Sequence, residues 1–240
     1  VCPQKAISME ADSSPVRTDR IVCAGCGKCV EVCAHQAREL SGRQYMTEDL
    51  LKEVEKDSAF YRRSGGGITV SGGEPTLQAP FVGGFLSLCR SHYFHTAMET
   101  CALTSWENLA PLLNSLDMVY IDLKHMDETR HLEWTGASNR VILENIRRVA
   151  KHHPVILRIP VVPGFNDSPE NIAQSAEFAK KLGNNILRLE LLPYHQFGRH
   201  GYDELERDYP IPMIQPPAQV HMEELRERIR ATDIRVEIGG

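Results

Sequence analysis

Residues 67–75, Gly67-Ile-Thr-Val-Ser-Gly-Gly-Glu-Pro75, contain the stretch that decides the fold. The apolar run Ile68–Ser71 predicts a short strand that is covered on both faces of a sheet. Directly after it comes Gly72-Gly73-Glu74-Pro75, a glycine turn that carries one carboxylate. A buried strand that ends in such a turn is typical of an α/β fold, in which functional loops follow the strands.

The same pattern continues along the chain, where strand-like and helix-like segments alternate after residue 45. This alternation is typical of βα units on a parallel sheet. The further expected strands are Thr96–Glu99, Met118–Leu123, Val155–Val162, Ile186–Leu192 and Ile234–Ile238. We therefore expect an α/β partial (β/α) TIM-like barrel over residues 46–240, with its chemistry at the C-terminal ends of the strands.

Three helices are predicted from their end signals. Thr47 is expected to cap a helix whose apolar residues continue as far as Phe60. Ser168, followed by proline, predicts the start of a helix that Gly183 ends. Pro217 is expected to open the last helix.

Polar and glycine residues follow five of the expected strands at the same end. They are Gly72–Pro75, Glu99-Thr100, Asp122-Leu123-Lys124, Pro163–Asp167 and Pro193-Tyr194-His195. Packing alone would not gather polar groups at one end of a sheet, so the sequence predicts a functional site there.

The composition excludes some classes of partner. With 42% hydrophobic residues, the 240-residue chain can bury the core of one α/β domain and a small appendage. The net charge of −5 gives no reason to expect nucleic acid or an anionic membrane as partner. No apolar run approaches the roughly 18 residues of a transmembrane helix, and no secretory signal precedes the first motif.

The appendage, residues 1–45, is rich in cysteine. Five of the seven cysteines lie in the first 33 residues, and four form the run Cys23-x2-Cys26-x2-Cys29-x3-Cys33. This spacing is typical of bacterial ferredoxins and predicts a [4Fe-4S] site. Zinc is the alternative, although zinc sites usually pair two separated knuckles or add histidines, and a disulfide framework suits secreted chains better.

The fourth cysteine of such a run ligates the other cluster in two-cluster ferredoxins. Cys2, which is followed by proline, looks like the end of an earlier run of the same kind. Cys2 is therefore predicted to complete the cluster held by the first three cysteines of the run. Cys33 would belong to a partial site whose other ligands lie upstream of Val1. Gly25 and Gly27 permit the tight backbone turns between the ligands.

Taken in order, four motifs resemble the glycyl-radical-enzyme-activating enzymes of the radical S-adenosylmethionine (SAM) superfamily, such as pyruvate formate-lyase activase. These are Gly72–Pro75, Asp122–Lys124, Arg158–Asp167 and Leu192–His195. The resemblance runs from about residue 1 to the final residues. With its truncated ferredoxin-like insert, the chain resembles the subgroup that acts on partners other than pyruvate formate-lyase.

The resemblance implies an oxidoreductase. In that family a [4Fe-4S] cluster binds and reduces SAM, and the 5′-deoxyadenosyl radical removes a hydrogen from a glycine Cα of a partner glycyl radical enzyme. It also implies a flavodoxin or ferredoxin-type reductant, a monomer and a cytoplasmic, anaerobic setting.

Roles for single residues follow from the same resemblance. Gly72, Gly73, Asp122 and Leu123 would line the SAM site, with Gly73 near the SAM amino group and Glu74 beside a cation. Lys124 would pair with the SAM carboxylate, and His195 would hydrogen-bond the ribose or adenosine part. Glu99, Thr100, Tyr120 and Asp122 would hold a monovalent cation.

The family's Cys-x3-Cys-x2-Cys motif for the catalytic cluster does not occur in the 240 residues. We expect it, with the first barrel strand, upstream of Val1. The catalytic cluster and its ligands would then be missing from this chain, and the chain as given would not cleave SAM.

Other interpretations remain open. The protein could be a ferredoxin-type electron-transfer module on a non-catalytic scaffold, or a radical SAM enzyme for another substrate. Arg158 could serve in an ion pair, and Asn166-Asp167 could merely cap the next helix. Cys89 is expected in the core, whereas Cys101 could line the site.

Overall fold

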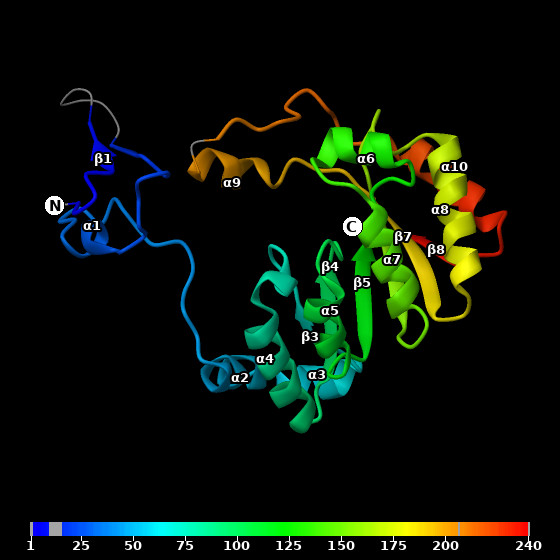
Figure 1. The fold of residues 1–240 in the computed structure, drawn as a ribbon, viewed down its shortest axis with the longest axis horizontal. Coiled ribbons are helices and arrows are strands. Elements are labelled where there is room, and N and C mark those ends of the chain that lie inside the picture. The colour runs from blue at the N-terminus through cyan, green and yellow to red at the C-terminus, as the bar shows by residue number, and fades with distance from the viewer. Residues whose placement is uncertain (1, 10–15, 206, 240) are drawn as a thin grey trace. The chain divides into compact units, whose positions relative to one another are not determined.

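A computed structural model of the chain describes residues 2–9, 16–205 and 207–239. The chain divides into two compact units, Val1–Met46 and Thr47–Gly240, and each is described by itself (Figure 1). We call them the N-terminal unit and the barrel unit.

The barrel unit is built on a sheet of six parallel strands. In sequence order these are β3 (Gly67–Val70), β4 (His95–Thr100), β5 (Met118–Asp122), β6 (Val155–Val161), β7 (Ile186–Pro193) and β8 (Val236–Ile238). Each strand pairs with the next one in the chain, so their C-terminal ends meet at one edge. All six predicted strands are present with bounds that differ by at most two residues, and the predicted α/β fold class is confirmed.

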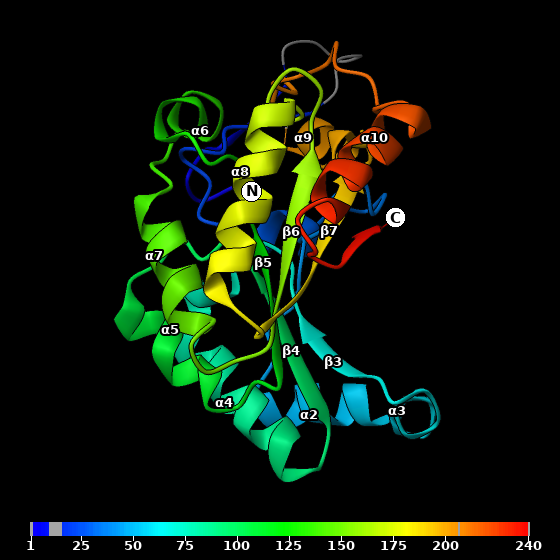
Figure 2. The same ribbon diagram turned by 90° about the vertical axis from the view of Figure 1, so that its right-hand side faces the viewer.

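Helical segments precede and connect the strands. They are α2 (Thr47–Glu55), α3 (Ser58–Ser64), the 3₁₀ helix η1 (Pro75–Gln78), α4 (Ala79–Ser91), α5 (Trp106–Leu113), α6 (Glu128–Thr135), α7 (Arg140–Val149), α8 (Pro169–Leu182), α9 (Arg199–Glu204) and α10 (Gln219–Arg230). In Figure 2, α4, α5, α7 and α8 lie along the same face of the sheet. The core fills the space between them, with Val119, Ile121 and Ile159 fully buried.

The opposite face of the sheet carries charged side chains. Burial alternates along β5 and along β6 from Leu157 onward, so that Asp122 and Arg158 are partly exposed between buried neighbours. The strand register places Asp122 opposite Arg158, Arg158 opposite Glu190, and Glu190 opposite Glu237. We call these four residues the charged row.

The end signals predicted α8 correctly. The Ser168 side chain accepts a hydrogen bond from the Asn171 N–H, Pro169 is the first helical residue, and Gly183 follows the last one. These signals are local, which explains why sequence alone located this helix.

The other two helix predictions need correction. Thr47 is the first residue of α2 rather than its cap, and its hydroxyl donates to the Glu48 carboxylate. The helix ends at Glu55, and Phe60 lies on the separate helix α3, where it is 68% exposed. The last helix begins at Gln219, two residues after Pro217.

The N-terminal unit has little regular structure. Strands β1 (Ile7–Ser8) and β2 (Arg17–Thr18) form an antiparallel pair, and the short helix α1 spans Lys28–Glu31. Gly25 and Gly27 have φ angles of 63° and 74°, in the left-handed region that glycine adopts without strain. The two glycines therefore make the turns between the cysteines of the run.

No helix within residues 2–9, 16–205 and 207–239 is long and apolar enough to cross a membrane.

Candidate functional site

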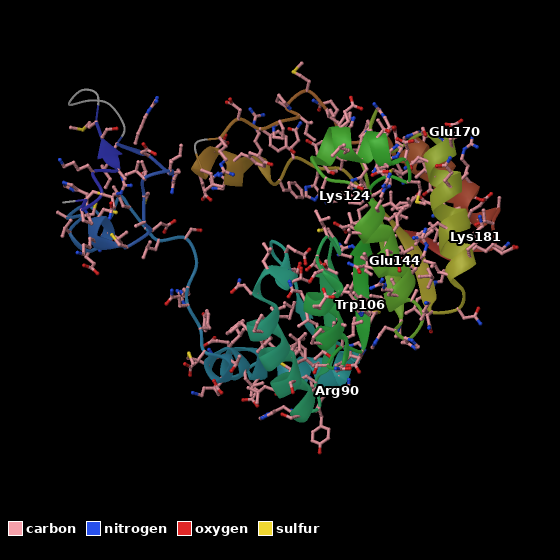
Figure 3. All side chains as sticks on the ribbon, viewed as in Figure 1. Arg90, Trp106, Lys124, Glu144, Glu170 and Lys181 are labelled. Atoms are coloured by element: carbon pink, nitrogen blue, oxygen red, sulfur yellow. The ribbon has the colours of Figure 1, made fainter. Side chains whose placement is uncertain are left out.

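A cavity of about 310 Å³ lies at the C-terminal ends of β3, β4 and β5. It is lined by Ser71, Gly72, Gly73, Glu74, Glu99, Thr100, Cys101, Asp122 and Lys124. The structure thus brings together five of the seven residues that the sequence proposes for SAM. Lys124 is labelled in Figure 3, beyond the end of β5.

The glycine turn opens directly onto this cavity. Gly72 has a φ of 114°, which side chains larger than glycine rarely adopt. A Cβ atom added to Gly72 or Gly73 would meet no atom within 4 Å. The backbone of the turn therefore faces free space and is accessible to a ligand.

The Glu74 carboxylate anchors the turn to the end of β4. Its Oε1 accepts hydrogen bonds from the Thr76 N–H (3.1 Å), the Thr76 hydroxyl (2.8 Å) and the Thr100 hydroxyl (2.7 Å). Its Oε2 accepts from the Cys101 N–H (2.9 Å) and thiol (3.1 Å). Burial raises the pKa of Glu74, but the bonds from Thr100, Cys101 and Thr76 outweigh it, so the net pKa is lowered.

This lowered pKa predicts an acid-sensitive stability. A carboxyl whose folded-state pKa is lowered stabilises the fold above its unfolded pKa, and the contribution is lost as the pH falls through the lowered value. We expect Glu74→Gln to reduce the free energy of unfolding by about 1–3 kcal/mol at pH 7. The difference from the parent should begin to shrink as the pH falls below about 4.3, the pKa of a glutamate in the unfolded chain, and should continue to shrink until the pH has passed the lowered folded-state pKa.

Urea unfolding at pH 7 and pH 3.5 would measure this difference. Glu177→Gln is the matched control, because the Glu177 side chain is 67% exposed on α8 and pairs only loosely with Lys181, at 3.6 Å. An equal loss for Glu74→Gln at both pH values would contradict the prediction.

Asp122 and Lys124 bring opposite charges to the cavity. The Lys124 Nζ lies 3.9 Å from the Asp122 Oδ2, and both side chains are about one-third exposed, 36% and 32%. Burial raises the pKa of Asp122, and the nearby Glu99 and Glu74 carboxylates act in the same direction, against Lys124 and Arg158. The ammonium of Lys124 is therefore held by one long contact and remains available to an anionic ligand.

Arg158 neutralises the acidic side of the site. Its guanidinium is 2.7 Å from the Glu99 carboxylate and 3.8 Å from that of Glu190, and it lies over the Tyr120 ring. Glu99 also accepts a 2.7 Å hydrogen bond from the Ser71 hydroxyl. In the structure, Arg158 therefore forms ion pairs within the barrel, as one of its interpretations proposed.

Two of the proposed SAM residues lie elsewhere. The Leu123 side chain is 2% exposed and packs into the helix-covered core, because it points to the opposite face from its neighbours. His195 is exposed and is not among the residues that line the cavity. Its Nδ1 accepts a 3.3 Å hydrogen bond from the Phe197 N–H, and the two rings are 4.3 Å apart.

A second cavity, of about 230 Å³, lies within the N-terminal unit. Its lining includes Cys2, Cys23, Cys26 and Cys29, but not Cys33. All seven cysteines lie in the described part of the chain and carry free thiols.

The loops that follow Cys2 and Cys33 have the same local structure. In each, the cysteine sulfur accepts a 3.3 Å hydrogen bond from the N–H four residues later, at Ala6 and Ala37. The residue before that N–H has a positive φ, which is 54° for Lys5 and 50° for Gln36. The Ala6 N–H lowers the pKa of Cys2.

Within residues 2–9, 16–205 and 207–239, no three histidine, cysteine or acidic side chains are close enough together to hold a single metal ion. Cys2, Cys23, Cys26 and Cys29 instead line one cavity. The remaining two cysteines differ from these. Cys89 is fully buried in the core, as predicted, and burial raises its pKa to about 11, whereas Cys101 lines the first cavity.

A scan of protein-family models matches residues 25–176 to the Radical SAM superfamily. Curated relatives are similar to this chain over nearly its whole length. The isethionate sulfite-lyase activating enzyme of Oleidesulfovibrio alaskensis is 40% identical over 88% of this chain and 68% of its own length. The trans-4-hydroxy-L-proline dehydratase activating enzyme of Clostridioides difficile is 36% identical over 100% of this chain and 91% of its own.

The chain belongs to the glycyl-radical-enzyme activating enzymes of the radical SAM superfamily. The resemblance inferred from the motifs is confirmed. A domain of a pyruvate-formate lyase-activating enzyme from Bacteroides vulgatus is also similar, with a TM-score of 0.62, 32% identity, and coverage of 73% of this chain and 99% of that domain. Streptococcus suis SuiB, at 15% identity and a TM-score of 0.63 over 84% of this chain and 44% of its own, shares the fold.

Membership of the radical SAM superfamily implies SAM and a [4Fe-4S] cluster as cofactors. In this radical SAM chain the sequence indicated Asn166 only as part of the loop after an expected strand or as a helix cap, and Ser71 only as the last residue of an expected strand. Ser71 is the residue before the glycine turn, and its hydroxyl reaches Glu99. Asn166 does not cap α8, a role that Ser168 fills, and is fully buried, with its Nδ2 donating to the carbonyls of Lys124 and Pro160.

Proposed function

We propose that this chain is part of an enzyme that uses SAM to create a radical on a glycine of a partner enzyme. We also propose that the cavity at β3, β4 and β5 holds the methionine end of SAM. The observation that carries the proposal is the meeting of an open glycine turn with Lys124 and Asp122 in one cavity, in a chain whose relatives are activating enzymes.

The groups of the cavity fit the two charges of that end of SAM. Its ammonium can donate to backbone carbonyls of the turn at Gly72 and Gly73, where an added Cβ would meet no atom within 4 Å. Its carboxylate can pair with the Lys124 ammonium, in a charge-assisted hydrogen bond. Leu123 would contribute through its main chain, and His195 would reach the adenosine end from the segment that follows β7.

When bound, a reduced [4Fe-4S] cluster supplies the electron that cleaves SAM to methionine, and the hydrogen atom taken from the glycine Cα ends in 5′-deoxyadenosine. The 240 residues contain no Cys-x3-Cys-x2-Cys, so we assign no ligand of this catalytic cluster to them. The role of the described residues would be to bind and orient SAM.

The N-terminal unit is proposed to be a ferredoxin-like insert with an auxiliary [4Fe-4S] cluster. Cys2, Cys23, Cys26 and Cys29 would be its ligands, which agrees with the cavity that they line. Cys33 would ligate a further cluster, because its loop has the same hydrogen bond and positive φ as the loop at Cys2. Electrons would reach these clusters from a flavodoxin or ferredoxin.

The monovalent cation implied by the resemblance remains a prediction, and two of its proposed ligands already have partners. Glu99 is bonded to Ser71 and Arg158, and the Thr100 hydroxyl donates to Glu74. No step of the proposal uses such a cation. A monomeric state and a cytoplasmic setting remain parts of the proposal that rest on the resemblance.

Anaerobic SAM cleavage tests the proposed function. The protein expressed from its complete gene would be loaded with iron and sulfide, reduced with dithionite and assayed for 5′-deoxyadenosine beside the 240-residue chain. We expect product from the complete protein. An iron-loaded complete protein that forms no product would leave the electron-transfer module as the better interpretation.

A further inference from the structure

We infer that Asn166 is a positioning residue, whose side chain fixes the main chain of Lys124 and thereby holds the Lys124 ammonium at the cavity. The inference rests on the proposed function in one respect, because it takes Lys124 to bind the SAM carboxylate. The hydrogen bonds that carry it are independent of that role.

The side chain of Asn166 joins two loops at the C-terminal edge of the sheet. It is 0% exposed. Its Nδ2 donates to the carbonyl of Lys124 (2.8 Å) and to that of Pro160 (2.7 Å), and its Oδ1 accepts from the Val162 N–H (2.8 Å). Both amide protons and the oxygen are used, so the segment after β5 is tied to the end of β6 and the loop after it.

Two more buried asparagines extend this connection. Asn171 donates to the Asn166 carbonyl (2.8 Å) and accepts from the Met126 N–H (2.9 Å). Asn139 donates to the carbonyls of His125 and Met126, both at 2.9 Å. Asn171 is 3% exposed and Asn139 is 2% exposed. Three buried amides thus hold the main chain from Lys124 to Met126.

The Lys124 side chain itself has little to hold it. It is 36% exposed, and its contact with Asp122 is long, at 3.9 Å. Ordering a lysine costs up to about 2 kcal/mol of side-chain entropy, which a weak ion pair does not offset. The position of the ammonium therefore depends on the position of the Lys124 main chain, which the hydrogen bond from Asn166 fixes.

The variant that tests the hydrogen bond from Asn166 to the Lys124 carbonyl is Asn166→Asp. Aspartate has the same size, but an oxygen replaces the amide nitrogen and would face the carbonyls of Lys124 and Pro160 without a proton to donate. Asn166→Ala, which removes the donor without adding a charge, is the second variant if the aspartate protein does not fold.

The matched control is Asn185→Asp. Asn185 also donates from Nδ2 to a backbone carbonyl, that of Ala150, at 2.8 Å. It lies directly before β7, at the end of the sheet opposite the cavity. This variant loses the same kind of bond far from Lys124.

Amide hydrogen exchange, measured without SAM, shows how firmly the main chain at Lys124 is held. In the protein expressed from its complete gene, we expect residues 124–127 to exchange at least tenfold faster in Asn166→Asp, or in Asn166→Ala, and at the parent rate in Asn185→Asp. Unchanged exchange of this segment in a folded Asn166 variant would overturn the inference, whatever happens to SAM binding.

A double-mutant cycle then measures whether Asn166 affects SAM affinity through Lys124. We expect Asn166→Asp to weaken equilibrium SAM binding about tenfold, and to add less than about twofold in a protein that already carries Lys124→Ala. Losses that simply add would show that Asn166 does not act through Lys124. If Lys124→Ala alone leaves SAM affinity unchanged, the proposed role of Lys124 fails, and hydrogen exchange still decides whether Asn166 holds its main chain.

Discussion

Replacing Lys124 with alanine is expected to weaken SAM binding by about ten- to a hundredfold. A hydrogen bond to a charged group contributes about 1.5–3 kcal/mol, and each 1.4 kcal/mol corresponds to a factor of ten. Lys124 faces the cavity with a loosely paired ammonium, so its loss removes the cation that would pair with the SAM carboxylate and leaves that carboxylate near Asp122. Anaerobic isothermal titration calorimetry of the iron-loaded complete protein measures the effect.

Two comparisons sharpen this experiment. Lys181→Ala removes a lysine from the outer helix α8, where its side chain is 77% exposed (Figure 3), and should leave SAM affinity unchanged. Lys124→Arg keeps the charge but changes its geometry, and should recover only part of the affinity. A Lys124→Ala protein that binds SAM as tightly as the parent would exclude this lysine from the site.

Replacing Cys2 with alanine is expected to remove the auxiliary cluster from the 240-residue chain, a loss of about four iron atoms per chain. The reason is that Cys2 lines the same cavity as the first three cysteines of the run, and three thiolates would leave one iron without its protein ligand. Cys26→Ala should have the same effect. Iron analysis and electron paramagnetic resonance of the reduced, reconstituted protein measure it.

Cys33→Ala is the discriminating variant. Cys33 lies outside the cavity lining, so its removal should leave the iron content of the 240-residue chain unchanged. If Cys33→Ala loses iron while Cys2→Ala retains it, the proposed pairing of cysteines with clusters is wrong. Loss of iron in both variants would mean that the two loops serve one site.

The strands and α8 could be predicted from sequence because their signals are local. Unbroken apolar runs mark strands covered on both faces, and Ser168, Pro169 and Gly183 each act within one turn of the helix. The boundary between α2 and α3 had only a weak signal, Asp57 directly before α3, whose side chain makes no cap hydrogen bond. Neither Gly nor Pro separates Glu55 from Ser58, so the apolar residues appeared to belong to one longer helix.

The site was partly predictable for a similar reason. In a parallel sheet, the residues after each strand must meet at one edge, and five of the proposed SAM residues do line one cavity. Leu123 could have been excluded, since strand alternation points it away from Asp122. The place of His195 depends on the path of the chain beyond β7, which no spacing determines. The role of Asn166 depends on a carbonyl 42 residues away, and sequence alone gives no sign of it.

The charged row has a consequence for how this sheet meets water. A closed barrel fills its interior with branched apolar side chains that have to be kept dry. Here Arg158 lies between the acids Asp122 and Glu190, and Glu237 adds a further acid, so this face is polar and carries an excess of negative charge. The inner face can thus tolerate exchange between solvent and an entering polar chain without a large hydrophobic penalty. A sheet of this kind remains wettable, whereas its helix-covered side behaves as an ordinary dry core.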